Sequence, residues 1–456
     1  MADSAASRLR SALPSPVLRA RFDVIAGPFL EHRGHDAALG QLDGVVLGGL
    51  AHVLASQGEA ARYLSRRPQL LERLAQARAE SLETRALELM QQAERESGVP
   101  DREPSRDLEI CLDELRLLRR DETVFAACLD LGGGRPFDEV SRLLSSLAEL
   151  CVARALREAK LHSPLDQRSP IAVLGMGKVA GRELTYHSDL DLVFLFPDTT
   201  PSPLQPAHLA QRLIVYLSTM TGAGVAYAVD SRLRPSGRQG ALVSSYASFE
   251  RYQLEHAAVW EHLTLMRARA IAGERDSAQA LLDGIRHRLR VDPRRAWREI
   301  DAMRRRVETE RAARRPGAFK TGAGGLMDVD FLAAGSLLER GPSDALPAIP
   351  DLLRTHVSGP RIERLLEDYA FLRRVEARTR WVVGRPVESV AVPGPHAAII
   401  AELVCPGLQP RELAQQLRSA QTRIRAAYQE VVQSGSIAAI DAPTPADASR
   451  SGPDAS

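Results

Sequence analysis

The chain has 456 residues, of which 44% are hydrophobic, 26% are charged and only 5% are aromatic, and its formal net charge is +2. This length is too great for one simple core and predicts two to four domains. The near-neutral charge and the lack of a stripe of interleaved aromatic and basic residues make nucleic acid an unexpected partner.

The cysteine content and the hydropathy pattern bear on the compartment. Cys111, Cys128, Cys151 and Cys405 are far apart and form no CxxC pair, which favours buried, reduced thiols. The N-terminus has no apolar stretch of signal-peptide length, and no apolar run is long enough to span a bilayer. We therefore expect a cytoplasmic protein with no membrane contact.

The first third of the chain has a helical pattern after a short polar start. Residues 1–20 are small, polar and interrupted by proline, which predicts a flexible N-terminus. Residues 21–165 are predicted to form a helical region. Its clearest signal is a set of residues spaced by four, which would share one helix face: Leu143, Leu147, Cys151 and Ala155.

Residues 166–275 differ from the rest because they contain β-like apolar runs. These runs are Ile171–Leu174, Leu190–Phe196 and Val225–Val229, and a helix from about 206 to 219 separates the last two. The connection between the first two runs is too short for a parallel crossover, so we expect them to pair antiparallel or to meet at an edge.

The remainder returns to a helical pattern. Residues 276–433 are predicted to form a helical bundle, with helices at about 362–381 and 410–432. Residues 434–456 are small, proline-rich and unpatterned, which predicts a disordered tail. The predicted fold class is therefore α+β and mostly helical, with a small mixed-sheet core between two helical regions.

Three aspartates at strand ends are the main candidates for chemistry. Asp189 and Asp191 are two residues apart at the start of a strand, so they should project from one face. Asp230 ends a later apolar run. Three such carboxylates can hold two Mg²⁺ ions on a nucleoside triphosphate. The alternatives are a turn cap at Asp189 and a structural ion pair of Asp230 with Arg232 or Arg234.

A glycine-rich turn separates the first two β-like runs. Gly175, Gly177 and Gly181 would let backbone N–H groups approach phosphate oxygens, with Lys178 as the counter-charge. The pattern is neither a P-loop nor a dinucleotide fingerprint, since both need spacings that are absent here. Taken alone it is a weak signal, because GxGK also occurs in ordinary turns.

A second glycine-rich motif, KTGAGGLMDVDF, begins at Lys320. One interpretation is a helix start, with Asp328 and Asp330 near the positive end of the helix dipole. The other interpretation is a second wall of the nucleotide site. The motif by itself favours the helix start.

The order of these motifs is more specific than any one of them. GMGKVAGRELTYHSDLDLVFLF is followed by VDSRLRPSGRQGALVSSYASFERYQLEHAAVWEH, RARAIAGE and KTGAGGLMDVDF, from about Ile171 to Phe331. This order resembles the bacterial glutamine synthetase adenylyltransferases, whose catalytic domains belong to the DNA polymerase β-like nucleotidyltransferase superfamily. A full-length family member is about twice as long and has two such domains, whereas this chain has one.

The resemblance implies a site, cofactors and partners. It implies two Mg²⁺ ions held by Asp189, Asp191 and Asp230, with Asp230 also helping to deprotonate the attacking hydroxyl. It implies ATP as substrate, glutamine synthetase as protein substrate and a PII signal protein as a further partner. The remaining residues implied to bind the nucleotide are Gly177, Lys178, Gly181, Ser188, Arg232, Arg234 and Lys320.

The direction of the reaction is left open by the family, because one domain attaches AMP to a tyrosine and the other removes it by phosphorolysis. The LRPSG, WEH and GGLMDVDF sequences are more similar to the attaching half, so we expect AMP attachment. Phosphorolysis, or a non-catalytic regulator that binds glutamine synthetase or a PII protein, are the alternatives. Two departures are Ala180, where the family has glycine, and Asp330, where it usually has glutamate.

Overall fold

The computed structural model describes residues 5–31, 35–77, 81–97, 107–132, 136–163, 168–312, 317–342 and 347–441. Residues 1–4 and 442–456 of the two predicted flexible ends lie outside these ranges. The prediction of a flexible N-terminus is wrong for residues 5–20, where the helices α1 (Ala5–Ser11) and α2 (Pro16–Ile25) form. Ser15 caps α2 by accepting a hydrogen bond from the backbone N–H of Leu18 at 3.3 Å, and Leu9, Leu18 and Phe22 are buried.

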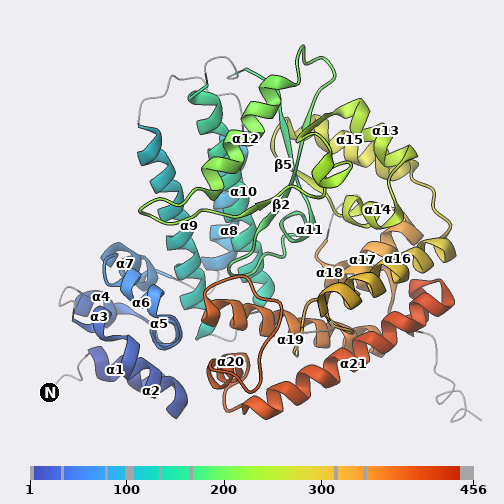
Figure 1. The fold of residues 1–456 in the computed structure, drawn as a ribbon. Helices are drawn as coiled ribbons and strands as arrows, with labels where there is room; N and C mark the ends of the chain where they lie inside the picture. The colour runs from blue at the N-terminus through green and yellow to red at the C-terminus, as the bar shows by residue number, and fades with distance from the viewer. Residues whose placement is uncertain are drawn as a thin grey trace, which may run out of the picture.

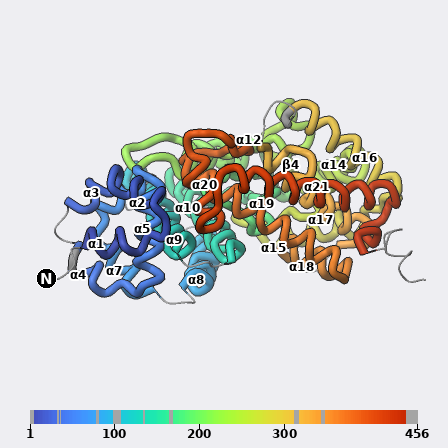
Figure 2. Tube along the Cα trace, turned by 90° about the horizontal axis from the view of Figure 1, so that it is seen from below, coloured from blue at the N-terminus to red at the C-terminus, as the bar shows by residue number. Residues whose placement is uncertain are grey.

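The N-terminal helical region consists of short helices followed by three long ones. Figure 2 shows the short helices gathered at one end of the molecule, opposite the end that holds α16 (Pro293–Val307) and α18 (Ile349–His356). The four residues spaced by four all lie buried on α10. The bounds of these helices are α3 (Gly27–Leu30), α4 (Asp36–Gln41), α5 (Gly44–Ser56), α6 (Gly58–Leu64), α7 (Pro68–Ala75), α8 (Ser81–Glu96), α9 (Leu108–Leu131) and α10 (Phe137–Leu161).

One five-stranded mixed sheet lies in the middle of the chain. Its order is β3-β2-β1-β5, with β4 paired to β2. β1 runs antiparallel to β2 and β5, whereas β2 runs parallel to β3 and β4. The antiparallel pairing of the first two strands confirms the prediction. The strands are β1 (Ala172–Gly175), β2 (Leu190–Phe196), β3 (Val229–Asp230), β4 (Val243–Ser245) and β5 (Arg269–Gly273).

The predicted third strand is mostly wrong. Only Val229 and Asp230 pair as a strand, because the backbone N–H groups of Ala226 and Tyr227 donate instead to the carbonyl of Leu217 at the end of α12 (Leu204–Ser218). The strands β4 and β5 were not predicted. They are short, and neither shows the alternation of apolar and polar residues that marks a strand in sequence.

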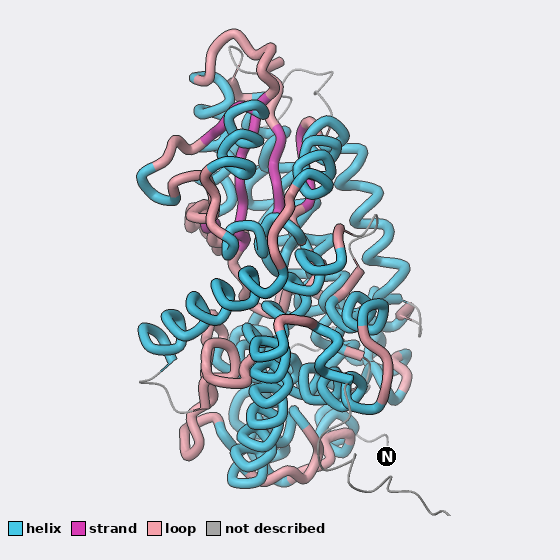
Figure 3. The backbone as a smooth tube through the Cα atoms, turned by 90° about the vertical axis from the view of Figure 1, so that its right-hand side faces the viewer, coloured by secondary structure: helices cyan, strands magenta, loops and turns pink. Residues whose placement is uncertain are grey.

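Helices cover both faces of the sheet, which explains its nearly continuous apolar strands. Along β2, Leu192 and Phe194 join the core that contains α10 and α12, whereas Val193 and Leu195 join a second cluster. That cluster includes residues of α13 (Tyr246–Glu255) and α15 (Arg275–Arg288). Figure 1 shows the sheet between these two pairs of helices, and Figure 3 shows that the strands lie toward one end of the molecule.

The C-terminal part is helical, and its two predicted helices are present as α19 and α21. The predicted disordered tail is wrong for residues 437–441, which form a 3-10 turn with Ile437 and Ile440 buried. One hydrophobic core runs from α1 to this turn, so the domain boundaries stay predictions. Further elements are α14 (Val259–Met266), a π-helix (Glu308–Ala312), α17 (Leu326–Arg340), α19 (Pro360–Val383), α20 (Ala397–Val404) and α21 (Pro410–Ser434).

The structure bears on two further predictions. Cys128 and Cys151 are buried as expected, but Cys405 is exposed and Cys111 is only partly buried. Within the described ranges, we find no helix with both the length and the apolar character needed to cross a membrane.

Candidate active site

The three predicted metal ligands come together at one edge of the sheet. β2 and β3 run parallel with Asp191 directly opposite Asp230, and Asp189 precedes Asp191 by two residues. Burial, together with the charges of Asp189 and Asp230, raises the pKa of Asp191 to about 7. The site therefore concentrates negative charge where a cation would be favourable.

The carboxylate of Asp230 forms an ion pair with the neighbouring Arg232. The Nε of Arg232 donates to the two carboxylate oxygens of Asp230 at 2.9 and 2.7 Å, and the backbone N–H of Arg232 donates at 2.9 Å. Burial raises the pKa of Asp230, but these hydrogen bonds outweigh it and leave the pKa below its usual value. Among the residues that the structure describes, no three metal-ligating side chains already surround a common point.

The glycine turn lies against the acidic group rather than standing apart from it. Gly177 begins the short helix α11 (Gly177–Ala180) with φ of +53°, and a Cβ added there would be 3.1 Å from Oδ2 of Asp191. Glycine is required at this position by both the backbone conformation and the nearby carboxylate. Ala180 is buried inside the helical turn and has no positive φ, so its methyl group imposes no backbone strain.

Replacing Gly177 by Ala should therefore impair the site. The left-handed backbone conformation would cost about 1–2 kcal/mol of folding free energy, and the new methyl group would push against the Asp191 carboxylate. For the nucleotidyl transfer that the resemblance implies, we expect a rate at least ~10-fold lower, since small displacements of reacting groups are costly. Gly284→Ala is the control, because a Cβ there has no atom within 4 Å. Equal transfer rates in the two variants would contradict this account.

Two of the predicted nucleotide-binding residues are held by α19. The ammonium of Lys178 lies 2.5 Å from Oε1 of Glu376, and burial lowers the pKa of Lys178 from its usual value. The hydroxyl of Ser188 accepts hydrogen bonds from the backbone of Thr185 at 3.1 Å and from Arg380 at 3.4 Å. Both side chains therefore make internal contacts in this structure.

The other predicted residues differ in what they contact. Gly181 ends α11 with an ordinary φ, and a side chain there would collide with buried Arg267. Arg234 donates to the carbonyls of Ser231 at 2.7 Å and Gly240 at 3.2 Å, which fixes the loop after β3. The guanidinium of Arg232 is half-exposed and lies beside Asp230, so it is positioned to contact a phosphate bound at the acidic group.

The second glycine motif forms the predicted helix start, and the charge of its first residue, Lys320, acts on Asp191. The side chain of Asp328 is fully buried, pairs with Arg304 and accepts the backbone N–H of Gly324 at 2.8 Å, as expected for a helix start. Lys320 instead pairs with Glu388 at 3.2 Å, and its charge lowers the pKa of Asp191. Burial and the charge of Glu183 raise the pKa of Asp330 to about 6. Lys320 thus acts electrostatically on the acidic group, whereas Asp328 is structural.

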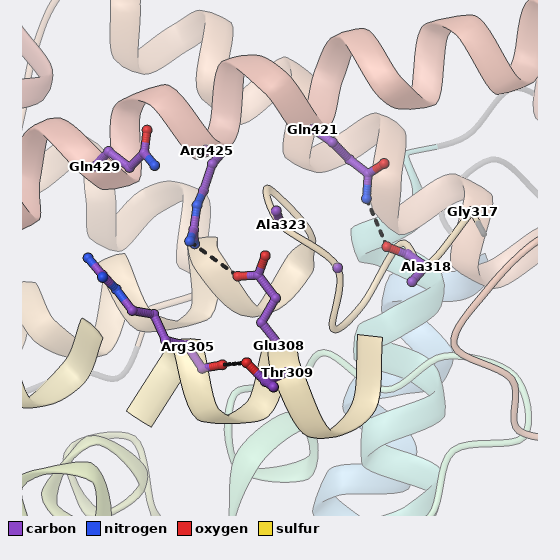
Figure 4. Close-up of a pocket in the computed structure, with 10 residues that line it drawn as sticks. Arg305, Glu308, Thr309, Gly317, Ala318, Ala323, Gln421, Arg425 and Gln429 are labelled. Carbon is purple, nitrogen blue, oxygen red and sulfur yellow. Dashed lines mark hydrogen bonds and ion pairs between the residues drawn. The ribbon is translucent and has the colours of Figure 1, made fainter. Parts of the chain in front are cut away.

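A cavity of about 760 Å³ lies on another side of this motif, between α21 and the π-helix that continues α16 (Figure 4). Gln421 donates to the carbonyl of Ala318 at 2.8 Å, and Arg425 pairs with Glu308 at 3.2 Å across the cavity. None of the three aspartates lines it. This cavity is therefore separate from the candidate active site.

Sequence reasoning missed the charged residues of α19 that support the site. Arg373, Glu376 and Arg380 are all buried, although their sequence, RRVEARTR, is typical of a solvated helix face. The length of this charged run could have indicated buried charges, because it leaves the helix without a purely apolar stripe to face the core. Only the packing of α19 against the core shows that these charges are internal.

The fold is α+β, with a five-stranded mixed sheet between two helical regions. A sequence model of the glutamate-ammonia ligase adenylyltransferase family matches residues 47–284, more than half of the chain. The chain belongs to this family.

Three relatives are bifunctional glutamine synthetase adenylyltransferase/adenylyl-removing enzymes. The protein from Chromobacterium violaceum is 36% identical over 310 residues, which cover 66% of this chain and 33% of the relative. The protein from Aromatoleum aromaticum is 36% identical over 332 residues, or 70% and 34% of the two chains. The protein from Thioalkalivibrio sulfidiphilus is 34% identical over 359 residues, or 72% and 36%. The matched region is thus about a third of each relative's length.

Proposed function

We propose that this protein transfers AMP from ATP to a tyrosine hydroxyl of glutamine synthetase. The tyrosine oxygen would form a bond to the α-phosphorus, the bond from that phosphorus to pyrophosphate would break, and the hydroxyl proton would pass to the Asp230 carboxylate. The observation that carries this proposal is the pairing of Asp191 with Asp230 beside Gly177, with Asp189 two residues away. A cytoplasmic location is part of the same proposal.

The donor set fits divalent metal ions. All three side chains supply carboxylate oxygen, the ligand type that Mg²⁺ takes in nucleotide sites. Asp230 would have to exchange Arg232 for a metal ion, which its position permits because the Arg232 side chain is 50% exposed. Two Mg²⁺ ions held by Asp189, Asp191 and Asp230 would neutralise the triphosphate and the leaving pyrophosphate. Arg232, once released, would lie beside the phosphates.

The names of the relatives include an adenylyl-removing activity, so the second candidate is removal of AMP by the same site. In that reaction a phosphate oxygen would attack the AMP phosphorus, the bond to the tyrosine oxygen would break, and ADP would leave. Both directions need the same acidic group. Regulation through a PII protein, or a purely regulatory role, are further proposals that the site geometry does not favour.

The test is mass spectrometry of glutamine synthetase after incubation with this protein, ATP and Mg²⁺. We expect one tyrosine of each modified subunit to gain one AMP, with release of pyrophosphate, and we expect added chelator to abolish the gain. A parallel incubation of adenylylated glutamine synthetase with phosphate and Mg²⁺ measures ADP. ADP formation without AMP attachment would assign the removing activity instead. If neither AMP attachment nor ADP formation is detected, both assignments are overturned.

A further inference from the structure

A buried carboxylate on α19 lies outside the sheet but contacts the site's supporting residues. The side chain of Glu376 is fully buried. Lys178 lies 2.5 Å from it, Arg373 donates to it at 2.8 Å, and Arg380 lies at 3.2 Å. Burial raises the pKa of Glu376, but these three cations outweigh it, so the pKa lies below its usual value and Glu376 is ionised.

The cations around Glu376 reach both turns that bound the acidic group. Lys178 directly follows Gly177, where an added Cβ would lie 3.1 Å from Oδ2 of Asp191. Arg380 donates at 3.4 Å to the hydroxyl of Ser188, the residue before Asp189. One carboxylate thus connects through Lys178 to the glycine turn, and through Arg380 to the turn formed by Ser188 and Asp189, called the Asp189 turn below.

A third connection extends this contact to the segment between the turns. Arg373, held by Glu376, donates to the backbone carbonyl of Glu183 and, at 3.3 Å, to the hydroxyl of Ser141 on α10. The carboxylate of Glu183 pairs with Arg267 at 2.7 Å. The loop from α11 to β2 is therefore held by α19 at Glu183 and Ser188, and by Arg267, which follows α14, at the Glu183 carboxylate.

The charge balance makes Glu376 the critical member of this cluster. Removing a partner from a buried ion pair leaves an uncompensated charge, which is costly and makes the remaining groups reorient. If Glu376 were neutral, Lys178 and Arg380 would lose their shared counter-charge. Both cations would then be drawn toward the nearest anions, and the two turns that carry them would lose their fixed positions.

We propose that Glu376 is a positioning residue for nucleotidyl transfer: by holding Lys178 and Arg380, it sets the glycine turn and the Asp189 turn at the spacing that the metal-bound nucleotide needs. This inference rests on the proposed function. It makes α19, in the predicted C-terminal bundle, part of the machinery that prepares the site. It also gives Lys178 the role of an anchor rather than of a direct phosphate ligand.

The test uses the full chain with Glu376→Gln, which keeps the side chain's shape and removes its charge. ATP binding is measured by calorimetry at several Mg²⁺ concentrations, below the unfolding temperature of each variant. We expect the affinity for Mg²⁺ and ATP to fall by ~10–100-fold, as is typical when a supporting residue of a metal site is lost. The matched control is Glu363→Gln on the same helix, whose carboxylate forms an exposed pair with Arg354, and it should change affinity by less than about twofold.

Arg380→Lys provides a second variant if Glu376→Gln does not fold. It keeps a cation beside Glu376 but shortens the reach to Ser188, and it should also weaken Mg²⁺-dependent ATP binding. A merely structural role would lower the unfolding temperature of these variants and leave the affinity of the folded protein unchanged, which would overturn the inference. If the unmodified protein itself binds no ATP with Mg²⁺, the proposed function fails, and this result is distinct from failure of the Glu376 variants alone.

Discussion

Asp191→Asn should abolish nucleotidyl transfer while leaving the protein folded. The substitution keeps the shape of the side chain and removes the carboxylate that lies between Asp189 and Asp230 at the sheet edge. Metal ions that stabilise the charge of a transferring phosphoryl group contribute several kcal/mol, and each 1.36 kcal/mol is a factor of ten in rate. We therefore expect a fall in kcat of ~10³-fold or more, measured as AMP incorporated into glutamine synthetase.

The fold should survive this change, and the metal-free protein should unfold at the same or a higher temperature. The reason is that burial and the neighbouring acids disfavour the charged form of Asp191, so loss of that charge relieves an unfavourable interaction. The control is Asp276→Asn, because Asp276 is an exposed residue of the first turn of α15. Transfer by Asp191→Asn at the rate of this control would remove Asp191 from the active site.

Asp130→Ala should cause the largest loss of stability among the substitutions considered. Asp130 is a buried residue of α9, and its carboxylate accepts hydrogen bonds from Arg378 of α19 at 2.8 Å and from the hydroxyl of Tyr186 at 2.8 Å. Breaking a buried ion pair by removing one partner typically costs 3–5 kcal/mol. We expect the free energy of unfolding, measured in urea, to fall by about that amount.

A surface ion pair provides the comparison. Arg354 and Glu363 form a pair with similar geometry, 2.9 Å between Nε and Oε1, but about half of each side chain is exposed. Exposed ion pairs contribute little to stability, so Glu363→Ala should lower the free energy of unfolding far less than Asp130→Ala. Similar losses for Asp130→Ala and Glu363→Ala would show that the buried pair does not hold α9, the Tyr186 turn and α19 together.

The sequence was sufficient for features that depend on local pattern. The long helix α10 was predicted because apolar residues recur at helical spacing along it, and α19 and α21 were predicted from the general helical pattern of the C-terminal part. The antiparallel pairing of β1 and β2 followed from the length of their connection. The strands β4 and β5 were missed because short strands gain their stability from neighbours in the sheet rather than from their own residues.

The candidate site was predicted only in part. The convergence of Asp189, Asp191 and Asp230 was inferred from their positions at strand ends, and the register of β2 and β3 places Asp191 opposite Asp230. The contact that Lys178 makes was not predicted, because its partner Glu376 is 198 residues away along the chain. The metal-binding and catalytic roles of the three aspartates remain proposals.

The sequence by itself determined that this protein has an acidic, glycine-bounded edge on a small sheet between helical regions, since strand alternation and turn chemistry are local properties. Tertiary structure alone decided which charges are buried together. Side chains of α19 contact Lys178 and also Ser188, the residue before Asp189. A buried charge needs a partner, and that partner comes from whichever helix packs against it. The C-terminal helices thereby become part of how the acidic edge is held.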